Sequence, residues 1–492
     1  MNGRLAARVG DGLALLAVAA FALAAVSYLL YQGYVDHGEA VMSAMAWRML
    51  HGAKVYLPFD DPDQITNLYG PLTFLWHSWP LALFGGGVSA SKAAATVAAL
   101  LLPPAIWLIV RKDPAITGWV MALTTGLLII HLAFPVVIRP DSLLTLMVAT
   151  ATLLAARDTE GMGRTILIGV AIGAGIGIKI HGALYFAPLA IYHFWGHWRR
   201  IPVMGVASVA VALAPFALPM FPLKEYLAWF GPMAGKENDW PYLLAMAELL
   251  ALYATPLLVW ALGGRRALAA TTLRERLYAG TYAAAMVLVL YPATKTGGGG
   301  HYLMPFLPVA ADQLRRAFAA GGSTARQRAG LMVAVLVALV TDWQCERRFF
   351  KKLEWEKSRA VVAEIEKIMD DYPGETVQMG IGRTPTDTGD QLSIHYYTWR
   401  NLPVYRGNPF TIDAAIVMEL HKLGMPFPAE AVHRFERCDT RIWLIPKDGE
   451  PFRLWGYYYQ EAFPEEVRTA FQGHYVKAES RTFFDVWKCR DR

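Results

Sequence analysis

The sequence predicts a polytopic α-helical membrane protein that carries a small α/β domain at its C-terminal end. Three observations lead to this fold class. The 492-residue chain is 55% hydrophobic and 17% charged, whereas ordinary soluble domains are about 25% charged. Residues 1–343 contain apolar runs close to the roughly 20 residues that span a bilayer. Residues 344–492 lack such runs and are rich in charged side chains.

About eleven apolar runs are predicted to be transmembrane helices, because they are too long for barrel strands and lipid tolerates little else. In chain order they span residues 12–32, 88–110, 115–135, 142–157, 164–179, 183–196, 202–221, 243–262, 276–293, 302–317 and 327–343. No small-residue cleavage site precedes Asp36, so the first run is interpreted as a retained helix. Residues 39–50 and 71–84 are predicted to be interfacial helices, since both stretches are too short to cross comfortably.

Arginine and lysine positions predict the orientation of these helices. With the N-terminus in the cytoplasm, alternation places the basic clusters on cytoplasmic loops, as the positive-inside rule expects. These clusters include Arg111 with Lys112, Arg199 with Arg200, Arg265 with Arg266, and Arg315 with Arg316. The opposite face then receives the long first loop (33–87), the loop before Asp141, the segment 295–302 and the C-terminal segment.

The C-terminal segment is predicted to be an α/β domain outside the membrane. Residues 346–371 fit a polar helix that continues from the last span. The expected strands are three short runs between turn signals, at 376–381, 441–445 and 481–488. The chain has three cysteines, too few for a disulfide framework. Cys438 and Cys489 could pair in an oxidising compartment or remain free thiols.

Three carboxylates at the outer face are candidate catalytic residues. Asp36 and Glu39 are spaced to lie on one face of a helix. A carboxylate at a dry membrane edge has its pKa raised by desolvation and lowered again by a nearby cation, so it could serve as a general base toward a hydroxyl or amine. Asp141, after Arg139, lies at the mouth of a later span pair. The structural alternatives are a capping box for Asp36 and Glu39 and a helix N-cap for Asp141.

Cations and aromatic residues at the same face are candidate substrate-binding residues. Arg139 has a planar fork that suits phosphate. Lys179 departs from the positive-inside trend, which favours a phosphate partner, although snorkelling to the membrane surface is the alternative. Four glycines between Lys295 and His301 could cradle a phosphate with backbone amides or form a flexible turn. The remaining candidates are His181, Tyr302 and Tyr69, and the first-loop aromatic residues fit interface packing better than sugar contact.

The order of short motifs in the membrane part resembles the GT-C glycosyltransferase superfamily. The resemblance is closest to the bacterial relatives of protein O-mannosyltransferases and lipid A aminoarabinose transferases. The motifs are DHGEA at 36–40, RMLHGAKVY at 48–56, YGPL at 69–72, RPDS at 139–142 and YLMPFLP at 302–308. Each motif is short, and their order and expected topology carry the resemblance.

This resemblance implies an enzyme of the bacterial inner membrane, a hexosyl- or pentosyltransferase that uses a polyprenyl-phosphate-linked sugar donor. The acceptor would be a glycan, lipid or protein of the cell envelope, and the active site would face the periplasm. Asp36 maps onto the catalytic base and Asp141 onto the second-loop acidic position. These two carboxylates could hold a divalent metal such as Mg²⁺ or Mn²⁺. The adjacent acidic pair common in the superfamily is split here into Asp36 and Glu39, so metal use stays open.

Two other classes of function remain as alternatives. A transporter or flippase for lipid-linked sugars would carry charges at the bilayer midplane and an internal repeat, and the sequence shows neither. A non-catalytic membrane assembly protein is the third reading. Membrane lipids are expected partners of all three classes. Nucleic acid is not an expected partner, because much of the net charge of +6 lies in short loops as topology signals.

Overall fold

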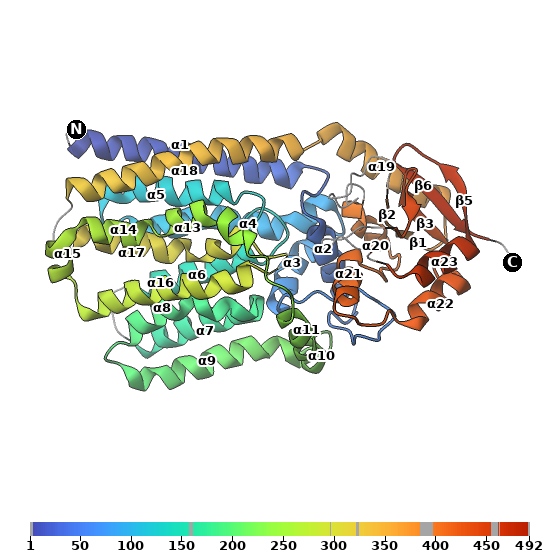
Figure 1. Ribbon diagram of the computed structural model, residues 1–492, viewed down its shortest axis with the longest axis horizontal. Helices are drawn as coiled ribbons and strands as arrows, with labels where there is room; N and C mark the ends of the chain where they lie inside the picture. Colours follow the sequence, from blue (N-terminus) through green and yellow to red (C-terminus); the bar gives the residue numbers. More distant parts are fainter. Residues whose placement is uncertain are drawn as a thin grey trace.

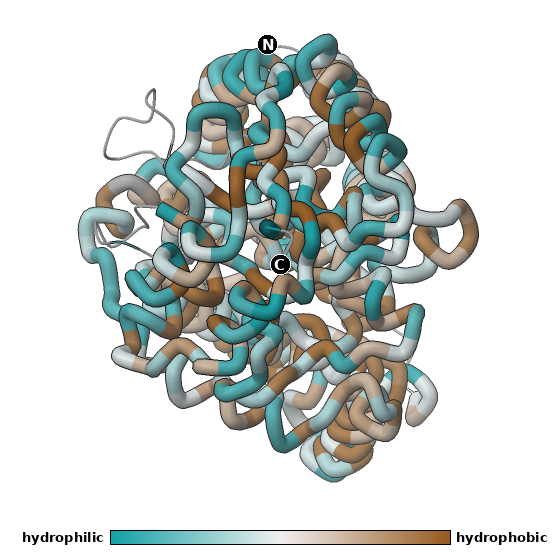
Figure 2. Tube along the Cα trace, turned by 90° about the vertical axis from the view of Figure 1, so that its right-hand side faces the viewer, coloured by the Kyte–Doolittle hydropathy of each residue, from teal (hydrophilic) through white to brown (hydrophobic). Residues whose placement is uncertain are grey.

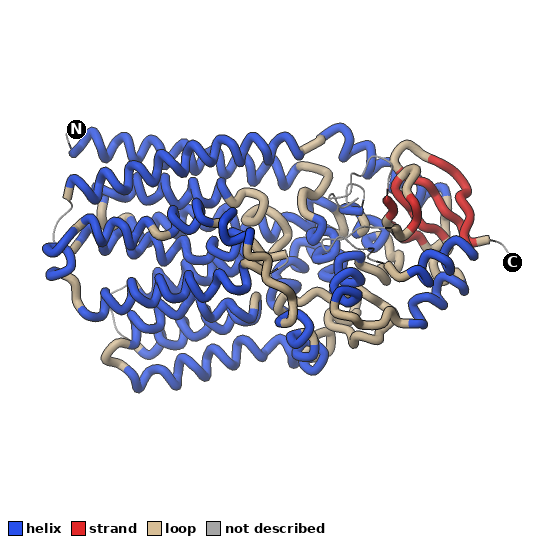
Figure 3. The backbone as a smooth tube through the Cα atoms, in the orientation of Figure 1, coloured by secondary structure: helices blue, strands red, loops and turns tan. Residues whose placement is uncertain are grey.

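The computed structural model describes residues 3–156, 161–295, 297–320, 324–383, 397–453, 461 and 463–490. The molecule is elongated, with a helical bundle at one end and a smaller domain at the other (Figure 1). The described strands all lie in the smaller domain (Figure 3). The bundle helices run along the long axis, and the N-terminus lies at the end remote from that domain.

Each predicted apolar run forms helix in the bundle. The helices are α1 (Gly3–Leu30), α4 (Val88–Val110), α5 (Pro114–Ile130), α6 (Asp141–Ala155), α7 (Met162–Ile178), α8 (Ala183–Phe194), α9 (Ile201–Leu213), α12 (Pro241–Ala245), α13 (Ala247–Tyr253), α14 (Thr255–Leu262), α16 (Leu273–Ala293), α17 (Leu307–Ala319) and α18 (Ala325–Lys352). The prediction of one helix over 243–262 is wrong, since three short helices cover it. Pro256 lies in the first turn of α14, where its missing N–H favours a helix start over a continued ladder.

Four helical segments are long and apolar enough to cross a membrane, judged by length and composition. They are Leu5–Leu30, Val88–Val110, Trp198–Ala217 and Ala325–Asp371. Shorter apolar helices, α5, α6 and α7, belong to the same bundle. Outer helices expose large apolar side chains, and Leu15 of α1 and Val206 of α9 are each 71% exposed. Such surfaces suit lipid contact, and the chain is a multi-pass membrane protein. The number of spans stays a prediction.

Short helices cover the end of the bundle that faces the small domain. The two predicted interfacial helices are present as α2 (His37–Leu50) and α3 (Pro71–Phe84). Asp36 is the N-cap of α2 and accepts the Gly38 N–H at 2.8 Å, while Glu39 accepts the Asp36 N–H at 3.1 Å. This is the capping box expected as the structural alternative. Further short helices at this end are α10 (Leu223–Ala228), α11 (Phe230–Ala234) and the 3₁₀ turns η1 (Ile180–Gly182), η3 (Ala214–Ala217) and η4 (Gly300–Phe306). At the opposite end lie α15 (Gly264–Ala270) and the 3₁₀ turn η2 (Trp198–Arg200), which connects α8 to α9.

The C-terminal domain packs helices around a four-stranded sheet. Its helices are α19 (Trp355–Asp371), α20 (Asn401–Tyr405), α21 (Ala414–Lys422), α22 (Ala429–Arg437), α23 (Glu465–His474) and the 3₁₀ turn η5 (Tyr397–Trp399). The sheet order is β1 (Val377–Met379), β3 (Ile442–Pro446), β6 (Phe484–Cys489), β5 (Tyr475–Ser480), and β2 (Gly382–Arg383) pairs separately with β4 (Glu450–Pro451). The fully buried β3 lies parallel to β1 and antiparallel to β6. The three predicted strands are therefore confirmed. The prediction missed β5, whose side chains are mostly exposed and polar.

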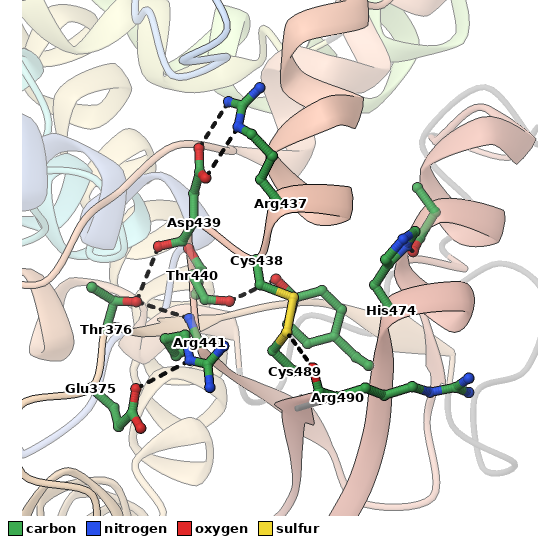
Figure 4. Close-up of a disulfide and its surroundings, with 12 residues drawn as sticks. Glu375, Thr376, Arg437, Cys438, Asp439, Thr440, Arg441, His474, Cys489 and Arg490 are labelled. Carbon is green, nitrogen blue, oxygen red and sulfur yellow. Dashed lines mark hydrogen bonds and ion pairs between the residues drawn. A yellow bond between two sulfur atoms is a disulfide. The ribbon is translucent and has the colours of Figure 1, made fainter. Parts of the chain in front are cut away.

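A disulfide joins Cys438 and Cys489, the two cysteines that the sequence left either paired or free (Figure 4). Cys438 caps α22 with a positive φ of 59°, and Cys489 ends β6. Their Cα atoms are 5.9 Å apart, which is within the range that a disulfide requires. Cys345 in α18 is a free cysteine. The bridge ties the end of a helix to the last strand of the sheet.

The C-terminal domain shares a hydrophobic core with the first loop. Val41 and Met45 of α2 belong to the same buried cluster as Ile365 of α19 and Leu444 of β3. Further along the loop, Gln64 is joined to the domain through two backbone hydrogen bonds, one to the Thr411 carbonyl (2.7 Å) and one from the Asp413 N–H (2.8 Å). The shared cluster and these backbone bonds pack the first loop and the domain as one body. Seen from the end of the molecule that carries the domain, hydrophilic segments alternate with hydrophobic ones (Figure 2).

Candidate active site

An ion pair joins Asp36 to Arg139 near the junction between the bundle and the C-terminal domain. Arg139 Nη2 lies 2.7 Å from Asp36 Oδ2, and the two side chains are 13% and 19% exposed. Asp36 begins α2, and Arg139 belongs to the loop before α6. Burial by itself would raise the pKa of Asp36. The Arg139 charge, His37 and the hydrogen bonds outweigh burial and hold this pKa well below its usual range.

A second ion pair joins Asp141 to Lys179. Lys179 Nζ lies 2.8 Å from Asp141 Oδ1, and the side chains are 5% and 1% exposed. The N-cap alternative for Asp141 is wrong, because the residue is inside α6 and makes no cap. Snorkelling is wrong for Lys179, whose ammonium is buried. Asp141 Oδ2 is buried and has no hydrogen-bond partner among the described residues, so this costly buried pair keeps an unused acceptor.

Aromatic rings surround the Lys179 ammonium. Its Nζ lies 4.4 Å from the ring centre of Tyr302 and 5.7 Å from that of Tyr69. His181 stacks on Tyr302 with ring centres 4.9 Å apart. Burial, reinforced by the Lys179 charge, lowers the pKa of His181 to about 3, so this imidazole is neutral near pH 7. The structure therefore brings together four of the predicted binding residues from the first loop, η1 and η4.

His301 lies on the Arg139 side of the same cluster. Its ring stacks on Phe134 at 4.2 Å, and the Arg139 guanidinium lies 5.3 Å from the centre of that phenyl ring. Burial, then the charges of Lys179 and Arg139, lower the pKa of His301 well below its usual range. Gly299, directly before η4, has a φ of 142°, which favours glycine. The glycine run acts here as a turn that delivers His301 into the cluster.

Lys295 lies apart from these residues. Its Nζ donates to the carbonyls of Ala234 (3.0 Å) and Lys236 (2.8 Å). Within the part of the chain that the structure describes, no hydrogen bond or ion pair joins it to Asp36 or Asp141. Thr296, next to it in the glycine loop, lies outside the described residues. Lys295 thus braces the loop between α11 and α12.

Glu39 is fully buried and ties three segments together. It accepts hydrogen bonds from the Tyr28 hydroxyl (2.5 Å), the Asp36 N–H (3.1 Å) and the Ile138 N–H (3.0 Å). Burial raises its pKa to about 7. Since Ile138 precedes Arg139, this carboxyl group anchors the loop that carries the guanidinium. This geometry indicates that Glu39 positions the loop of Arg139 and does not itself touch substrate.

Two further residues support the site and were not predicted. Lys92, buried in α4, donates to the Tyr28 carbonyl at 3.0 Å, and its charge inside an apolar run was a signal that sequence reasoning could have used. Arg400 of the C-terminal domain donates to the His37 carbonyl at 2.9 Å and pairs with Asp413 at 2.7 Å. No local pattern marks Arg400, because its contact with the first loop spans most of the chain.

The two carboxylates suggested as metal ligands from sequence, Asp36 and Asp141, are both engaged in ion pairs. Across the described residues, no group of three or more His, Cys, Asp or Glu side chains is placed to hold a metal ion. Metal binding stays a prediction from the sequence.

A cavity of about 790 Å³ lies beside the far end of α2, against the C-terminal domain. Its lining includes Trp47, Arg48, Asp63, Tyr405 and Arg434. None of the predicted site residues lines it. Arg48 follows Asp36 by twelve residues of helix, which corresponds to roughly 18 Å along the axis. The cavity is thus a neighbour of the ion-pair cluster and is distinct from it.

Two solved structures resemble this chain over nearly its whole length. ArnT from Cupriavidus metallidurans bound to undecaprenyl phosphate has 13% sequence identity and a TM-score of 0.56, and apo ArnT from the same organism has 13% identity and 0.55. In both comparisons the match covers 96% of this chain and 97% of ArnT. No family model matches the sequence, and no curated protein matches it. At this identity the likeness establishes the fold.

Proposed function

The chain has the GT-C fold, and from that premise we propose that it is a membrane glycosyltransferase. It moves a hexosyl or pentosyl group from a polyprenyl-phosphate donor to a glycan, lipid or protein acceptor in the periplasm. The observation that carries the proposal is the double ion pair, Asp36 with Arg139 and Asp141 with Lys179. ArnT, which shares the fold, has been solved with undecaprenyl phosphate bound.

Arg139 and Lys179 bind the phosphate of the donor in this proposal. Arg139 Nε is buried and, within the part of the chain that the structure describes, has no hydrogen-bond partner, so a phosphate oxygen can accept from it. Lys179 places an ammonium group between two tyrosine rings. When the bond from C1 to the phosphate oxygen breaks, the leaving phosphate gains negative charge. Preformed cations stabilise such a transition state more than the ground state.

Asp36 orients the acceptor and takes its proton. The acceptor hydroxyl or amine attacks C1, the bonding electrons leave with the phosphate, and the acceptor proton passes to the Asp36 carboxylate. While Arg139 is paired with it, Asp36 is ionised but weakly basic, because its pKa is lowered. A donor phosphate that engages Arg139 weakens this pair and lets burial raise the basicity of Asp36. Donor binding and base activation are thereby coupled.

The test is sugar transfer in washed membranes supplied with a panel of radiolabelled polyprenyl-phosphate hexoses and pentoses. Asp36→Asn is expected to lower transfer by a factor of about 10² or more, the range for loss of a general base. Asparagine still caps α2, and the level of the variant in the membrane is matched to wild type by immunoblot. Asp60→Asn, at an exposed position of the same loop, is the matched control and keeps wild-type transfer. Near-normal transfer by Asp36→Asn contradicts the assigned role, and movement of label across the membrane without transfer favours a flippase.

A further inference from the structure

A second cavity, of about 360 Å³, lies at the end of the bundle remote from the C-terminal domain, the left end in Figure 1. The ends of α6, α8, α16 and α17 contribute to its walls. Its described charged lining residues are all cationic: Lys112, Arg164, Arg200, Arg274, Arg315 and Arg316. No residue of the candidate active site lines it, so its ligand is independent of the proposed transfer reaction.

Two of these arginines are fixed by one tyrosine. The guanidinium carbons of Arg274 and Arg316 lie 4.0 and 4.1 Å from the ring centre of Tyr192. Arg316 Nη1 also donates to the Tyr192 hydroxyl at 2.6 Å, and Arg274 Nε donates to the Tyr192 carbonyl. Cation–π contact and hydrogen bonding together hold both planar groups in place. The cavity wall is therefore preorganised.

Three of the lining arginines, Arg274, Arg315 and Arg316, have one carboxylate among their described contacts, that of Asp312. Asp312 pairs with both Arg315 (2.8 Å) and Arg316 (2.7 Å), and its side chain is 3% exposed. Arg274 has its described contacts with Tyr192, which is uncharged. Desolvated positive charge is unfavourable unless it is compensated. The positive-inside rule asks only for basic loops and does not account for two arginines stacked on one tyrosine in the wall of a cavity.

We propose that this cavity binds a phosphate group at the membrane surface that the charge distribution assigns to the cytoplasm. The group is the headgroup phosphate of an anionic lipid or a free phosphate ion. Arginine forks match phosphate oxygens in a bidentate manner. Basic pockets between transmembrane helices on this side of a membrane are suited to anionic headgroups. The site lies at the opposite end of the bundle from the C-terminal domain.

The test uses the full chain purified in detergent and depleted of lipid. Phosphatidylglycerol, phosphatidylcholine and inorganic phosphate are titrated separately, and binding is followed by native mass spectrometry and by the shift in Tm. Wild-type protein is expected to bind phosphatidylglycerol at least tenfold more tightly than phosphatidylcholine, with weakening at higher salt. Arg274→Gln and Lys112→Gln are each expected to weaken binding roughly tenfold, the effect of losing one charge-assisted hydrogen bond.

Arg326→Gln is the matched control, because Arg326 is exposed in the first turn of α18 and does not line the cavity. It should bind like wild type. Lys112 is exposed and is in no described hydrogen bond, so Lys112→Gln decides the question if Arg274→Gln fails to fold. Saturation by phosphatidylglycerol alone identifies the lipid, and saturation by inorganic phosphate identifies the free ion. Equal binding of the two lipids with no effect of phosphate, or wild-type binding by both variants, overturns the proposal.

Discussion

The Asp36 carboxylate and the Arg139 guanidinium lie 2.7 Å apart although 103 residues separate them in the chain. Both positions are fixed by neighbours. Asp36 caps α2, and the residue before Arg139 donates its N–H to Glu39. The pair is therefore set by the backbone of two loops before any substrate arrives, which is the preorganisation that electrostatic catalysis requires.

The first prediction concerns the pH dependence of transfer in Arg139→Gln. With Arg139 present, the pKa of Asp36 is lowered, so the carboxylate persists throughout the neutral range. Without the guanidinium, burial remains and raises this pKa. As pH is lowered, the transfer rate of Arg139→Gln should therefore fall at a higher pH than the rate of wild type, because its Asp36 carboxylate is protonated earlier. Initial rates measured from pH 5 to 8 test this, and Arg139→Lys, which keeps the charge, should retain the wild-type profile. If wild type and Arg139→Gln lose transfer activity over the same pH range, Arg139 does not lower the pKa of Asp36.

The second prediction separates the two lysines proposed from sequence. Lys179→Met is expected to lower transfer at least 10²-fold, because it leaves Asp141 as a buried charge and removes a phosphate contact. Lys295→Met is expected to stay within tenfold of wild type, since its ammonium bonds to loop carbonyls. The measurement is kcat and KM for the donor, with membrane protein levels matched by immunoblot. Equal losses of transfer activity in the two variants would indicate that Lys295 is part of the active site.

The third prediction concerns the contact between the C-terminal domain and α2. Arg400 and Asp413 form an ion pair whose side chains are 1% and 2% exposed. Arg400→Met leaves Asp413 uncompensated and is expected to destabilise the fold by about 3–5 kcal/mol. Arg406→Met breaks an ion pair with Asp370 in which the two side chains are 47% and 64% exposed. Its loss is expected to lower the free energy of unfolding by about 0–1 kcal/mol. Denaturant unfolding of the purified protein compares the two, and similar stabilities would show that Arg400 does not hold the domain.

The fourth prediction concerns the disulfide between Cys438 and Cys489. The bridge closes a segment with a sequence separation of 51, so the chain-entropy estimate gives about 4 kcal/mol of stabilisation. Replacing both cysteines with serine is expected to lower the Tm of the C-terminal domain, whereas Cys345→Ser should leave it unchanged. Maleimide labelling of the unfolded, unreduced chain should detect one thiol. Three labelled thiols would show that the bridge does not form.

The sequence predicted the helical elements well, because long apolar runs and interfacial stretches leave few alternatives in lipid. The break within 243–262 was missed, since a proline inside an apolar run does not tell whether a helix kinks or restarts. β5 was missed because it is a short strand at the sheet edge whose mostly exposed side chains include no run of large apolar residues.

Part of the candidate site was visible in the sequence as well. The motif order led to Asp36, Arg139 and Asp141, and a departure from the positive-inside trend led to Lys179. The structure places these four residues in two ion pairs. How these charges pair could not be predicted, because each pair joins segments that are far apart in the sequence. The position of Lys295 away from these ion pairs could not be predicted either, because it depends on how the loops pack. Arg400 escaped notice since an arginine in a charged domain has no local signature.

The buried cluster that Val41 and Met45 share with Ile365 and Leu444 has a consequence for the history of this protein. It joins a loop near the start of the chain to a domain near its end through side chains that must fit one another. A domain exchanged between homologues would have to bring the matching loop with it. The two segments are therefore expected to have diverged together, as one inherited unit, despite their distance in the gene.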